Sequence, residues 1–408
     1  MRVCMIVRNS CVRDPRVLKE AGSLARAGHE LTVIATAEPG ASASEARDGF
    51  AIHRVEPVPG WVRRVTGRAP LPTQAATPAS TAGEIPTQRR PYALTTFRDI
   101  LVTRQLTTAA LATPADVYHA HDLNTLQAAA RAARRHRARL VYDAHELYPE
   151  LTGLGKAERA RWARIERRLI STPDVVITPS ESRADEMARR YRIPRPSVVM
   201  NCPPAGPAPD PAASPLAALR RPGERLLVYS GGFTGNRGLE NLVRAMRHLH
   251  GFRLAMVGWG RLESELRAIT VQENLGDRIE FIPVVEHDQV VAVVAGADIG
   301  IAPYLPVGLN NVLAAPNKLF EYLHAGLAVA GSDLPDIRRV VETHRIGALF
   351  NAVDPLSIAL AVREIVDSDD LPAMRERALA AAPGYTWEAQ EDVLRDIYAA
   401  LGESGAVG

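Results

Sequence analysis

A lysine and a glutamate stand one helical turn apart in the segment APNKLFEYLHAG, residues 315–326. Pro316 suits the first turn of a helix, because its missing N–H costs nothing there, and Gly326 suits the end. At i,i+3 spacing, Lys318 and Glu321 lie on one helical face. First-turn N–H groups and an ammonium favour a phosphate, and a carboxylate accepts hydrogen bonds from paired sugar hydroxyls. The pattern fits a nucleoside diphosphate, and a surface salt bridge is the alternative.

The choice of lysine at this place is itself informative. Of 49 basic residues only Lys19, Lys156 and Lys318 are lysine. Lysine is a compact point charge, whereas arginine is a planar fork. We therefore infer that Lys318 is present for its shape, with chance retention of a lysine as the alternative.

A glycine-rich turn offers a second place for an anion. LVYSGGFTGNRGLENL, residues 227–242, reads as a strand that opens into a loop and then a helix. Gly231 and Gly232 let backbone N–H groups approach a phosphate, and Arg237 can complete the site. The segment is neither a P-loop nor a G-x-G-x-x-G dinucleotide motif. A tight strand–helix turn without a ligand is the alternative.

Two apolar strands each end in a histidine. The segments are HAHDLNTL, residues 119–126, and YDAHELYPE, residues 142–150. Placed at strand ends, His121 and His145 are expected to face a cleft, where they can contact a sugar hydroxyl or move a proton. Each histidine could bind zinc together with the carboxylate that follows it. No further ligand stands at a usual spacing, however, so no metal is expected. The structural alternative is that each histidine caps the helix that follows it.

The elements that position these residues alternate between apolar runs and helical patterns. Runs that are apolar at nearly every position indicate strands buried on both faces, and hence parallel sheets. The pattern predicts an α/β protein with two doubly wound Rossmann-like domains that face each other across a cleft. The expected strands are RVCMIVRN, ELTVIAT, FAIHRVE, DVYHAH, RLVYDAH, DVVITPS and SVVMN, then LLVYSGG, RLAMVGWG, IEFIPVV, ADIGIAPY, LAVAGS and ALFN.

Composition shifts mark the expected boundaries. A proline-rich stretch after Cys202 predicts a linker, and a second proline-rich stretch predicts a long loop in the first domain. The predicted parts are a first domain at 1–201 with its loop at 57–91, a linker at 202–224, a second domain at 225–385, and a helix at 386–402 that packs on either lobe.

Bulk properties narrow the class of protein. The chain has 408 residues, 46% of them hydrophobic and 23% charged, as in soluble globular proteins. The opening MRVCMIVRNS is too short for a signal segment, which argues against a periplasmic binding protein, and no stretch approaches a membrane span. Three cysteines without metal-like spacing predict reduced thiols and a cytoplasmic location.

The basic charge has an open interpretation. Net charge is +3 overall, but the first half of the chain is basic and the second half acidic. RAARRHRAR at 131–139 and KAERARWARIERRL at 156–169 suit peripheral contact with the inner face of a membrane, or simply amphipathic helices in an arginine-rich chain. With 5% aromatic residues and no recognised module, no nucleic-acid partner is expected.

In order and content these motifs resemble the retaining GT-B glycosyltransferases, specifically the large family four of sugar-nucleotide enzymes. RNSCVRDPRVLKEAGSLARAGHELTVIA resembles the family's first loop, helix and strand, and HAHD and DAHE resemble its histidine strands. SGGFTGNRGLENL resembles the donor phosphate loop, ADIGIAPY with APNKLFEYLHAGLAVAGSDLP the donor-binding core, and YTWEAQEDVLRDIY the closing helix. The resemblance covers nearly the whole chain.

The resemblance implies roles for the residues above. Arg237 and Lys318 would neutralise the departing diphosphate, and Glu321 would hold the ribose. His145 would touch the donor sugar. The donor would be a UDP-hexose or UDP-amino sugar, which is a co-substrate, and no cofactor or metal would be needed. The acceptor would be a hydroxyl of a small natural product, glycan or lipid. The reaction would be a front-face displacement. Further donor contacts would come from Gly231, Gly232, Asn317, Leu319, Ile282 and Val284, and acceptor-side candidates are Asp14, Arg16, His121 and Asp122.

One position departs from the family pattern. The family often has a second Glu eight residues before Glu321, and this chain has Leu313 there, with Asn310 and Asn311 as nearby substitutes. The chain thus resembles a subgroup that lacks the first Glu of Glu-x7-Glu. A sugar-nucleotide binder without catalysis and a sugar-nucleotide 2-epimerase are the alternatives, and the second lacks the extra acidic cluster that its chemistry needs.

Overall fold

The computed structural model describes residues 1–57 and 92–403. The long loop expected at 57–91 lies outside these ranges except for its first residue. None of the helices in the described ranges carries an apolar stretch long enough to cross a bilayer. The described chain divides into two compact units: Met1–Val199 with the C-terminal segment from Glu391, and Met200–Gln390.

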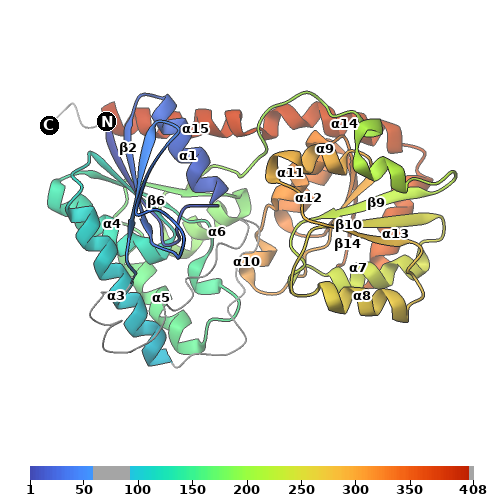
Figure 1. Cartoon of the computed structure of the whole chain (residues 1–408), viewed down its shortest axis with the longest axis horizontal. Coiled ribbons are helices and arrows are strands. Elements are labelled where there is room, and N and C mark those ends of the chain that lie inside the picture. The colour runs from blue at the N-terminus through green and yellow to red at the C-terminus, as the bar shows by residue number, and fades with distance from the viewer. Residues whose placement is uncertain (58–91, 404–408) are drawn as a thin grey trace. The chain divides into compact units, whose positions relative to one another are not determined.

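The first unit is built on one eight-stranded sheet flanked by helices (Figure 1). Its strands are β1 Arg2–Ile6, β2 Glu30–Thr36, β3 Ser44–Arg47, β4 Phe50–Val55, β5 Val117–His121, β6 Arg139–Asp143, β7 Val175–Thr178 and β8 Ser197–Val198. Its helices are α1 Pro15–Arg26, α3 Tyr92–Leu111, α4 Leu123–His136, the short η1 Tyr148–Glu150, α5 Lys156–Leu169, α6 Glu181–Tyr191 and most of α15 Trp387–Glu403.

Strand order in this sheet is β3-β4-β2-β1-β5-β6-β7-β8, and every pair is parallel except β3 with β4. All seven strands expected in this part of the chain are present. The sheet contains one strand that the sequence does not predict, the edge strand β3 of sequence SEAR. This strand is polar and mostly exposed, so no apolar run marks it.

The second unit repeats the architecture with a six-stranded, fully parallel sheet. Its strands are β9 Arg225–Ser230, β10 Phe252–Val257, β11 Ile279–Ile282, β12 Ile299–Ala302, β13 Ala328–Ser332 and β14 Gly347–Phe350, all six as expected. Its helices are α7 Leu239–Ala245, α8 Glu263–Gln272, α9 Val290–Val294, α10 Leu309–Val312, α11 Asn317–His324, α12 Pro335–His344, α13 Pro355–Asp367 and α14 Leu371–Ala381, and its short 3-10 turns are η2 Pro211–Ala213, η3 Pro215–Leu219, η4 Met246–His248, η5 His287–Gln289 and η6 Ala382–Tyr385.

Two hydrophobic cores cover the two faces of this second sheet. Successive side chains of a strand point to opposite faces, so Leu227 and Tyr229 pack in one core while Leu226 and Val228 pack in the other. Helices α7, α8 and α13 close the first core, and α9, α11 and α12 close the second; Figure 1 shows α7 and α8 on the opposite side of the sheet from α9, α11 and α12. This burial on both faces explains why the strands read as unbroken apolar runs.

The segment predicted as a linker is packed rather than free. Cys202 and Leu216 are fully buried in a core of the second unit, and η2 and η3 lie within the segment. A proline-rich composition disfavours the interior of a helix. Proline is accepted at the first position of a helical turn, however, and both short turns begin with one.

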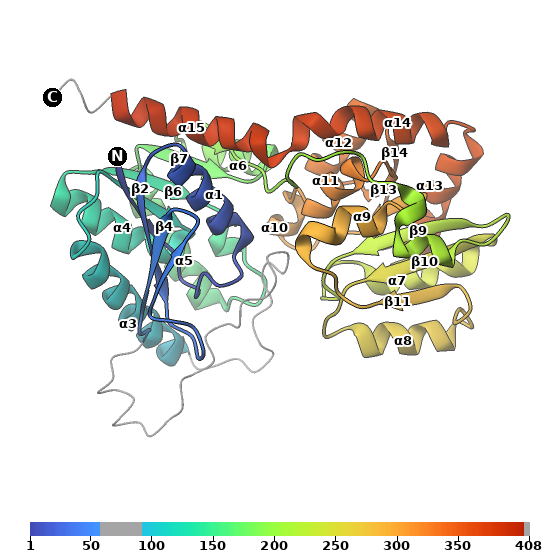
Figure 2. The ribbon, with the colours of Figure 1, turned by 45° about the horizontal axis from the view of Figure 1, so that its top comes forward.

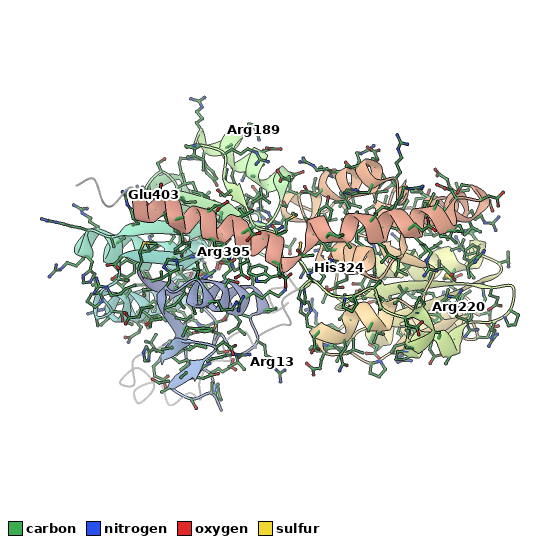
Figure 3. The ribbon with its side chains drawn as sticks, turned by 90° about the horizontal axis from the view of Figure 1, so that it is seen from above. Arg13, Arg189, Arg220, His324, Arg395 and Glu403 are labelled. Atoms are coloured by element: carbon green, nitrogen blue, oxygen red, sulfur yellow. The ribbon has the colours of Figure 1, made fainter. Side chains whose placement is uncertain are left out.

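The last helix, α15, contributes its C-terminal part to the first unit. Figure 2 shows it beside α1, and Figure 3 shows Arg395 and Glu403 along its length. Tyr398 is fully buried, and its hydroxyl lies 2.9 Å from His119 Nδ1. Arg26 on α1 forms an ion pair with Glu391. These contacts fasten the end of the chain to the first sheet.

Candidate active site

The order of the second sheet places a ligand site at one point on its edge. The order β11-β10-β9-β12-β13-β14 reverses direction between β9 and β12. In such doubly wound sheets, ligands bind outside the carboxyl ends of the strands at this switch point. The residues there are Ser230 at the end of β9 with Gly231 after it, and Pro303 and Tyr304 after β12.

Two cations share one tyrosine ring at this switch point. Arg237 Cζ lies 4.3 Å from the centroid of the Tyr304 ring, and Lys318 Nζ lies 5.1 Å from it. Lys318 Nζ also lies 4.6 Å from the Tyr229 ring, and 3.5 Å from the Tyr304 hydroxyl. Although burial opposes it, the positive charges of Arg237 and Lys318 lower the pKa of Tyr304 below its usual value of 10. The site is therefore strongly electropositive before any ligand arrives.

Burial changes the interpretation of the Lys318–Glu321 pair. Lys318 is only 5% exposed and Glu321 7%, and within the described residues neither forms an ion pair. Glu321 Oε2 instead accepts a hydrogen bond from the Ser230 hydroxyl at 3.3 Å. The surface salt-bridge alternative is wrong, and a buried ammonium without a carboxylate partner is costly unless an anion joins it.

Glycines set the close approach between loop and helix. Gly231 has φ +127°, and a Cβ there would lie 3.1 Å from Lys318 Nζ. Gly238, at the end of the loop, has φ +64°, and a Cβ there would lie 2.4 Å from the Pro303 carbonyl oxygen. Glycine is therefore required at both positions, and it lets the loop backbone lie directly against the cation cluster.

Helix α11 presents its first turn at the same edge. Pro316 is the residue before the helix rather than its first residue, and Gly326 has the left-handed φ of +63° expected after a helix end. The first N–H groups of a helix have no carbonyl one turn before them within the helix, so the N–H groups of Asn317 and Lys318 have no acceptor inside α11. Leu319 differs from the prediction, because its N–H donates to the Pro316 carbonyl at 2.9 Å and is not available to a phosphate.

The remaining donor-side candidates lie on neighbouring loops. Ile282 ends β11, and its carbonyl accepts a hydrogen bond from the Gly258 N–H at 3.0 Å. Val284, two residues later, is an exposed apolar side chain. Leu313, at the position where the family often has glutamate, is buried, as is Asn310 on α10.

In the first unit, the candidates form a buried polar cluster. The Arg16 guanidinium donates to both carboxylate oxygens of Asp143 at 2.8 Å and to the Val199 carbonyl at 2.7 Å. Arg16 Nε is also 3.1 Å from Glu20 Oε1, one turn along α1. Arg16 is buried and supports this cluster from within, and its role on the acceptor side stays a prediction.

The two histidines predicted at the strand ends have different environments. His121 is fully buried, with Nδ1 3.2 Å from His145 Nε2, and its role on the acceptor side stays a prediction. The His145 side chain is 20% exposed and lies 2.8 Å from Asp143 Oδ2. Although burial opposes it, the carboxylates of Asp143 and Asp122 raise the pKa of His145 to about 9, so it is a cation at neutral pH.

Two further acceptor-side candidates stay partly accessible. Asp14 precedes α1, where its side chain accepts from the Val17 N–H at 3.2 Å and from Asn9 Nδ2 at 2.7 Å. Asp122 precedes α4 with φ +64°, and its side chain is 26% exposed. Burial raises the pKa of Asp122, although the positive charge of His145 opposes this shift. Asp14 thus caps a helix, while Asp122 is free to meet a ligand at its exposed oxygen.

The same cluster contains a donor set that a metal ion would use. Ligand atoms of Glu20, His119, His121 and Asp143 lie within 4.8 Å of one another. The His119 and His121 rings, however, are stacked 4.4 Å apart at 15°, so their in-plane nitrogen lone pairs run parallel instead of converging. Arg16 also supplies the positive charge next to both carboxylates. The expectation of no metal stays a prediction, favoured by these two features.

Several residues of both clusters were not predicted. Tyr229 and Tyr304 end expected strands, and Glu20 follows Arg16 by four residues, so each had a positional signal. Tyr398 comes from the far end of the chain, and no local pattern could connect it with His119.

Two family models match the chain in order. Residues 14–204 match the glycosyl transferase 4-like domain, and residues 224–368 match the glycosyl transferases group 1. These matches correspond to the two structural units. The chain therefore belongs to the GT-B glycosyltransferases.

Curated relatives are similar over part of their length. The putative colanic acid biosynthesis glycosyltransferase WcaL of Escherichia coli is 25% identical over 177 residues, 42% of each chain. The phosphatidyl-myo-inositol mannosyltransferase of Mycobacterium leprae is 27% identical over 203 residues, 48% of this chain and 51% of that one. The lipopolysaccharide core biosynthesis glycosyltransferase LpsD of Rhizobium meliloti is 28% identical over 262 residues, covering 63% and 67%. The matches thus span about half or less of the first two relatives.

Solved structures share the fold over nearly the whole chain. A sucrose-phosphate synthase from Thermosynechococcus elongatus superposes with a TM-score of 0.72 at 18% identity, covering 99% of this chain and 100% of that one. Anabaena HepE in complex with UDP superposes with a TM-score of 0.68 at 14% identity, covering 98% and 100%. At these identities the likeness shows the GT-B fold.

Proposed function

We propose that the chain is a retaining glycosyltransferase that moves a sugar from a nucleoside-diphosphate sugar to an acceptor hydroxyl. The observation that carries the proposal is the pair of cations, Lys318 and Arg237, held over one tyrosine ring at the switch point of the second sheet. A buried ammonium in this setting needs an anion to offset its desolvation, and a diphosphate supplies one. Glu321, one turn along the helix, is the proposed partner of the ribose hydroxyls.

The donor is proposed to be a UDP-hexose or UDP-amino sugar. Anabaena HepE, which shares the fold, has been solved with UDP and with UDP-glucose. In this chain the loop around Val284 is proposed to meet the base, with Asn317 and the glycine-rich turn at Gly231 and Gly232 against the phosphates. The partly exposed His145 is proposed to contact the sugar.

The proposed reaction forms and breaks bonds on one face of the sugar. The bond from the anomeric carbon to the leaving phosphate oxygen breaks, and a bond from that carbon to the acceptor oxygen forms on the same face. The acceptor's proton passes to the departing phosphate oxygen, so no protein base is needed. Charge develops on the diphosphate, where Lys318 and Arg237 stabilise it without a metal; one such electrostatic group is typically worth roughly 2.7–4 kcal/mol.

The acceptor is proposed to be a hydroxyl of a small natural product, glycan or lipid, approached by Asp122 of the first unit. A cytoplasmic location accompanies this proposal, because the buried cysteines Cys4, Cys11 and Cys202 form no disulfide. A second candidate function is sugar-nucleotide binding without catalysis. Its basis is the buried, apolar Leu313 at the position where the family often has glutamate.

The test is a transfer assay with UDP-glucose and UDP-N-acetylglucosamine against a panel of acceptors. Release of UDP is measured first, and the anomeric configuration of the product is then read by NMR. Product with the configuration of the donor supports the proposal. Product with the inverted configuration contradicts retention, and tight UDP binding without turnover on any acceptor, or hydrolysis, favours the non-catalytic binder.

A further inference from the structure

At the amino end of the second sheet, three arginines gather around one buried carboxylate. Asp298 lies directly before β12, and its side chain is only 2% exposed. Its Oδ2 accepts a hydrogen bond from the Leu226 N–H at 2.8 Å, and its Oδ1 accepts one from Arg220, labelled in Figure 3, at 2.9 Å. Arg375 Nη1 lies 3.5 Å from the same Oδ1, and Arg225 Nη1 lies 4.0 Å from it. Three guanidinium groups therefore share one carboxylate, which leaves a formal excess of two positive charges.

Two of these arginines line a cavity and keep hydrogen-bond donors free. The cavity has a volume of about 340 Å³, and its lining residues are Arg225, Asp298, Leu371, Pro372 and Arg375. Among the described residues, the Arg225 guanidinium donates no hydrogen bond, and 48% of its side chain is exposed. Arg375 Nε donates to the Gly326 carbonyl at 2.9 Å, while its Nη2 has no acceptor in the described part of the chain. The cavity therefore offers a ligand several uncommitted N–H groups.

The arginine cluster is short of negative charge. Burial and the positive charges of the other two arginines lower the pKa of Arg375, although the Asp298 carboxylate acts in the opposite direction. The guanidinium groups therefore repel one another more than the single carboxylate offsets. Asp370, the residue before α14, is already paired with Arg377. An anion in the cavity would offset the remaining repulsion.

We propose that this cavity binds a small phosphate monoester, with its phosphate against Arg225 and Arg375 and its organic part against Leu371 and Pro372. Guanidinium groups bind phosphate oxygens through paired, charge-assisted hydrogen bonds. A phosphate monoester carries about −1.5 to −2 charges at neutral pH, which matches the excess positive charge of the cluster. The cavity volume lies at the lower end of the range for small-molecule sites, about 300–1,000 Å³, so it has room for more than inorganic phosphate.

The cavity is separate from the candidate active site of the same unit. Arg225 begins β9 and Ser230 ends it, so the strand separates the backbones of these residues by roughly 17 Å at about 3.3 Å per residue. Asp298 likewise precedes β12, whereas Tyr304 follows it. The cavity thus lies at the amino ends of strands whose carboxyl ends carry the Lys318 site. The inference goes beyond the proposed glycosyl transfer and does not rest on it.

The experiment is isothermal titration of the full chain with glucose 6-phosphate, glycerol 3-phosphate and inorganic phosphate at constant ionic strength. We expect saturable binding of a phosphate monoester, and weaker binding of inorganic phosphate because it cannot reach the apolar wall of Leu371 and Pro372. Arg225→Gln is expected to weaken binding of the monoester by roughly 10- to 150-fold, the range for a hydrogen bond to a charged group. Arg225→Lys, which keeps the charge and loses the paired geometry, is expected to weaken it less.

Two control variants separate this cavity from general charge effects and from the candidate active site. The Arg247 side chain on η4 is 50% exposed, as Arg225 nearly is, and does not line the cavity, so Arg247→Gln is expected to leave binding of the monoester unchanged. Lys318→Met, which removes a cation at the other end of the sheet, is expected to keep the binding that Arg225→Gln weakens. Denaturant unfolding of each variant reports folding.

Three outcomes would overturn the inference. The first is no saturable binding of any of the three phosphates by the unmodified chain. The second is equal weakening in the Arg225→Gln and Arg247→Gln variants, which would indicate a general effect of charge. The third is binding that Lys318→Met abolishes and Arg225→Gln keeps, because that binding belongs to the candidate active site. Failure of the chain to bind a nucleoside diphosphate would contradict the proposed function and would leave this inference intact.

Discussion

Replacing Lys318 by methionine should separate stability from ligand binding at the second-unit site. Methionine has nearly the same length and packs well against aromatic rings, so it can fill the space between Tyr229 and Tyr304. The Lys318 ammonium lies 4.6 Å and 5.1 Å from the two ring centroids, where cation–π attraction is worth about 2 kcal/mol per desolvated contact. Removing the buried charge also removes a desolvation penalty of several kcal/mol.

The two terms oppose each other and the desolvation penalty is the larger, so we expect the ligand-free variant to be as stable as the unmodified chain or more stable, by up to about 4 kcal/mol. Binding of a nucleoside diphosphate should fall by roughly 10- to 150-fold, because a charge-assisted hydrogen bond to phosphate is worth about 1.5–3 kcal/mol. Turnover should fall by about 10²–10³ further if the charge acts in the transition state.

The assay is isothermal titration with the diphosphate, combined with denaturant unfolding of the ligand-free protein. Lys156→Met on α5 is the matched control, because that lysine is exposed and far along the chain from the site. Unchanged diphosphate affinity in the Lys318 variant would refute the phosphate assignment. A large loss of ligand-free stability would refute the claim that this ammonium is kept for its ligand.

Two further perturbations test the local geometry and the buried acid of α5. Gly231→Ala should weaken diphosphate binding at least tenfold in titrations, because the new methyl group would lie 3.1 Å from the Lys318 ammonium and the φ angle there is unsuited to alanine. The control is Gly206→Ala, since a Cβ at Gly206 has no neighbour within 4 Å. Equal binding in both variants would contradict the packing argument. Burial, opposed by two tyrosine hydroxyls, raises the pKa of Glu166 from 4.5 to about 7, so the folded state holds this proton more tightly than the unfolded chain. The contribution of Glu166 to stability is therefore full below pH 4.5 and is lost as the pH rises through 7. The free energy of unfolding, measured with denaturant, should fall by about 3 kcal/mol over this range, and Glu166→Gln should abolish that fall. An unchanged pH slope in the Glu166→Gln variant would contradict the assignment of this pH dependence to Glu166.

The fold could be predicted largely because buried parallel strands leave a strong signal. Every apolar run that was interpreted as a strand is one, since burial on both faces removes polar residues from the run. The polar edge strand β3 had no such signal. The packing of the segment after Cys202 could not be predicted, because composition reports a preference for irregular backbone and does not report whether that backbone packs on a core.

The candidate site was predictable only in part. Lys318, Glu321 and Gly231 are brought together by the strand order, which the restarted alternation of strands and helices already suggested. The tyrosine rings beneath Lys318 come from two other strands, and their orientation follows from packing that no local pattern encodes. The burial of Arg16 and His121 could not be predicted for the same reason, because a strand-end or helix-start position does not reveal whether a side chain points outward or into a polar cluster.

The central claim is that the second unit binds a nucleoside diphosphate through Lys318, Arg237 and Glu321. The most direct measurement is a thermal-shift panel with UDP, GDP, dTDP, ADP and NAD on the unmodified chain and on Glu321→Ala. At a hundred times its dissociation constant a ligand adds roughly 2.7 kcal/mol of stability, which is readily detected. We predict that one nucleoside diphosphate stabilises the unmodified chain and that the Glu321 variant loses most of this effect. Stabilisation by NAD alone, by none of the five, or equally in both proteins would contradict the claim.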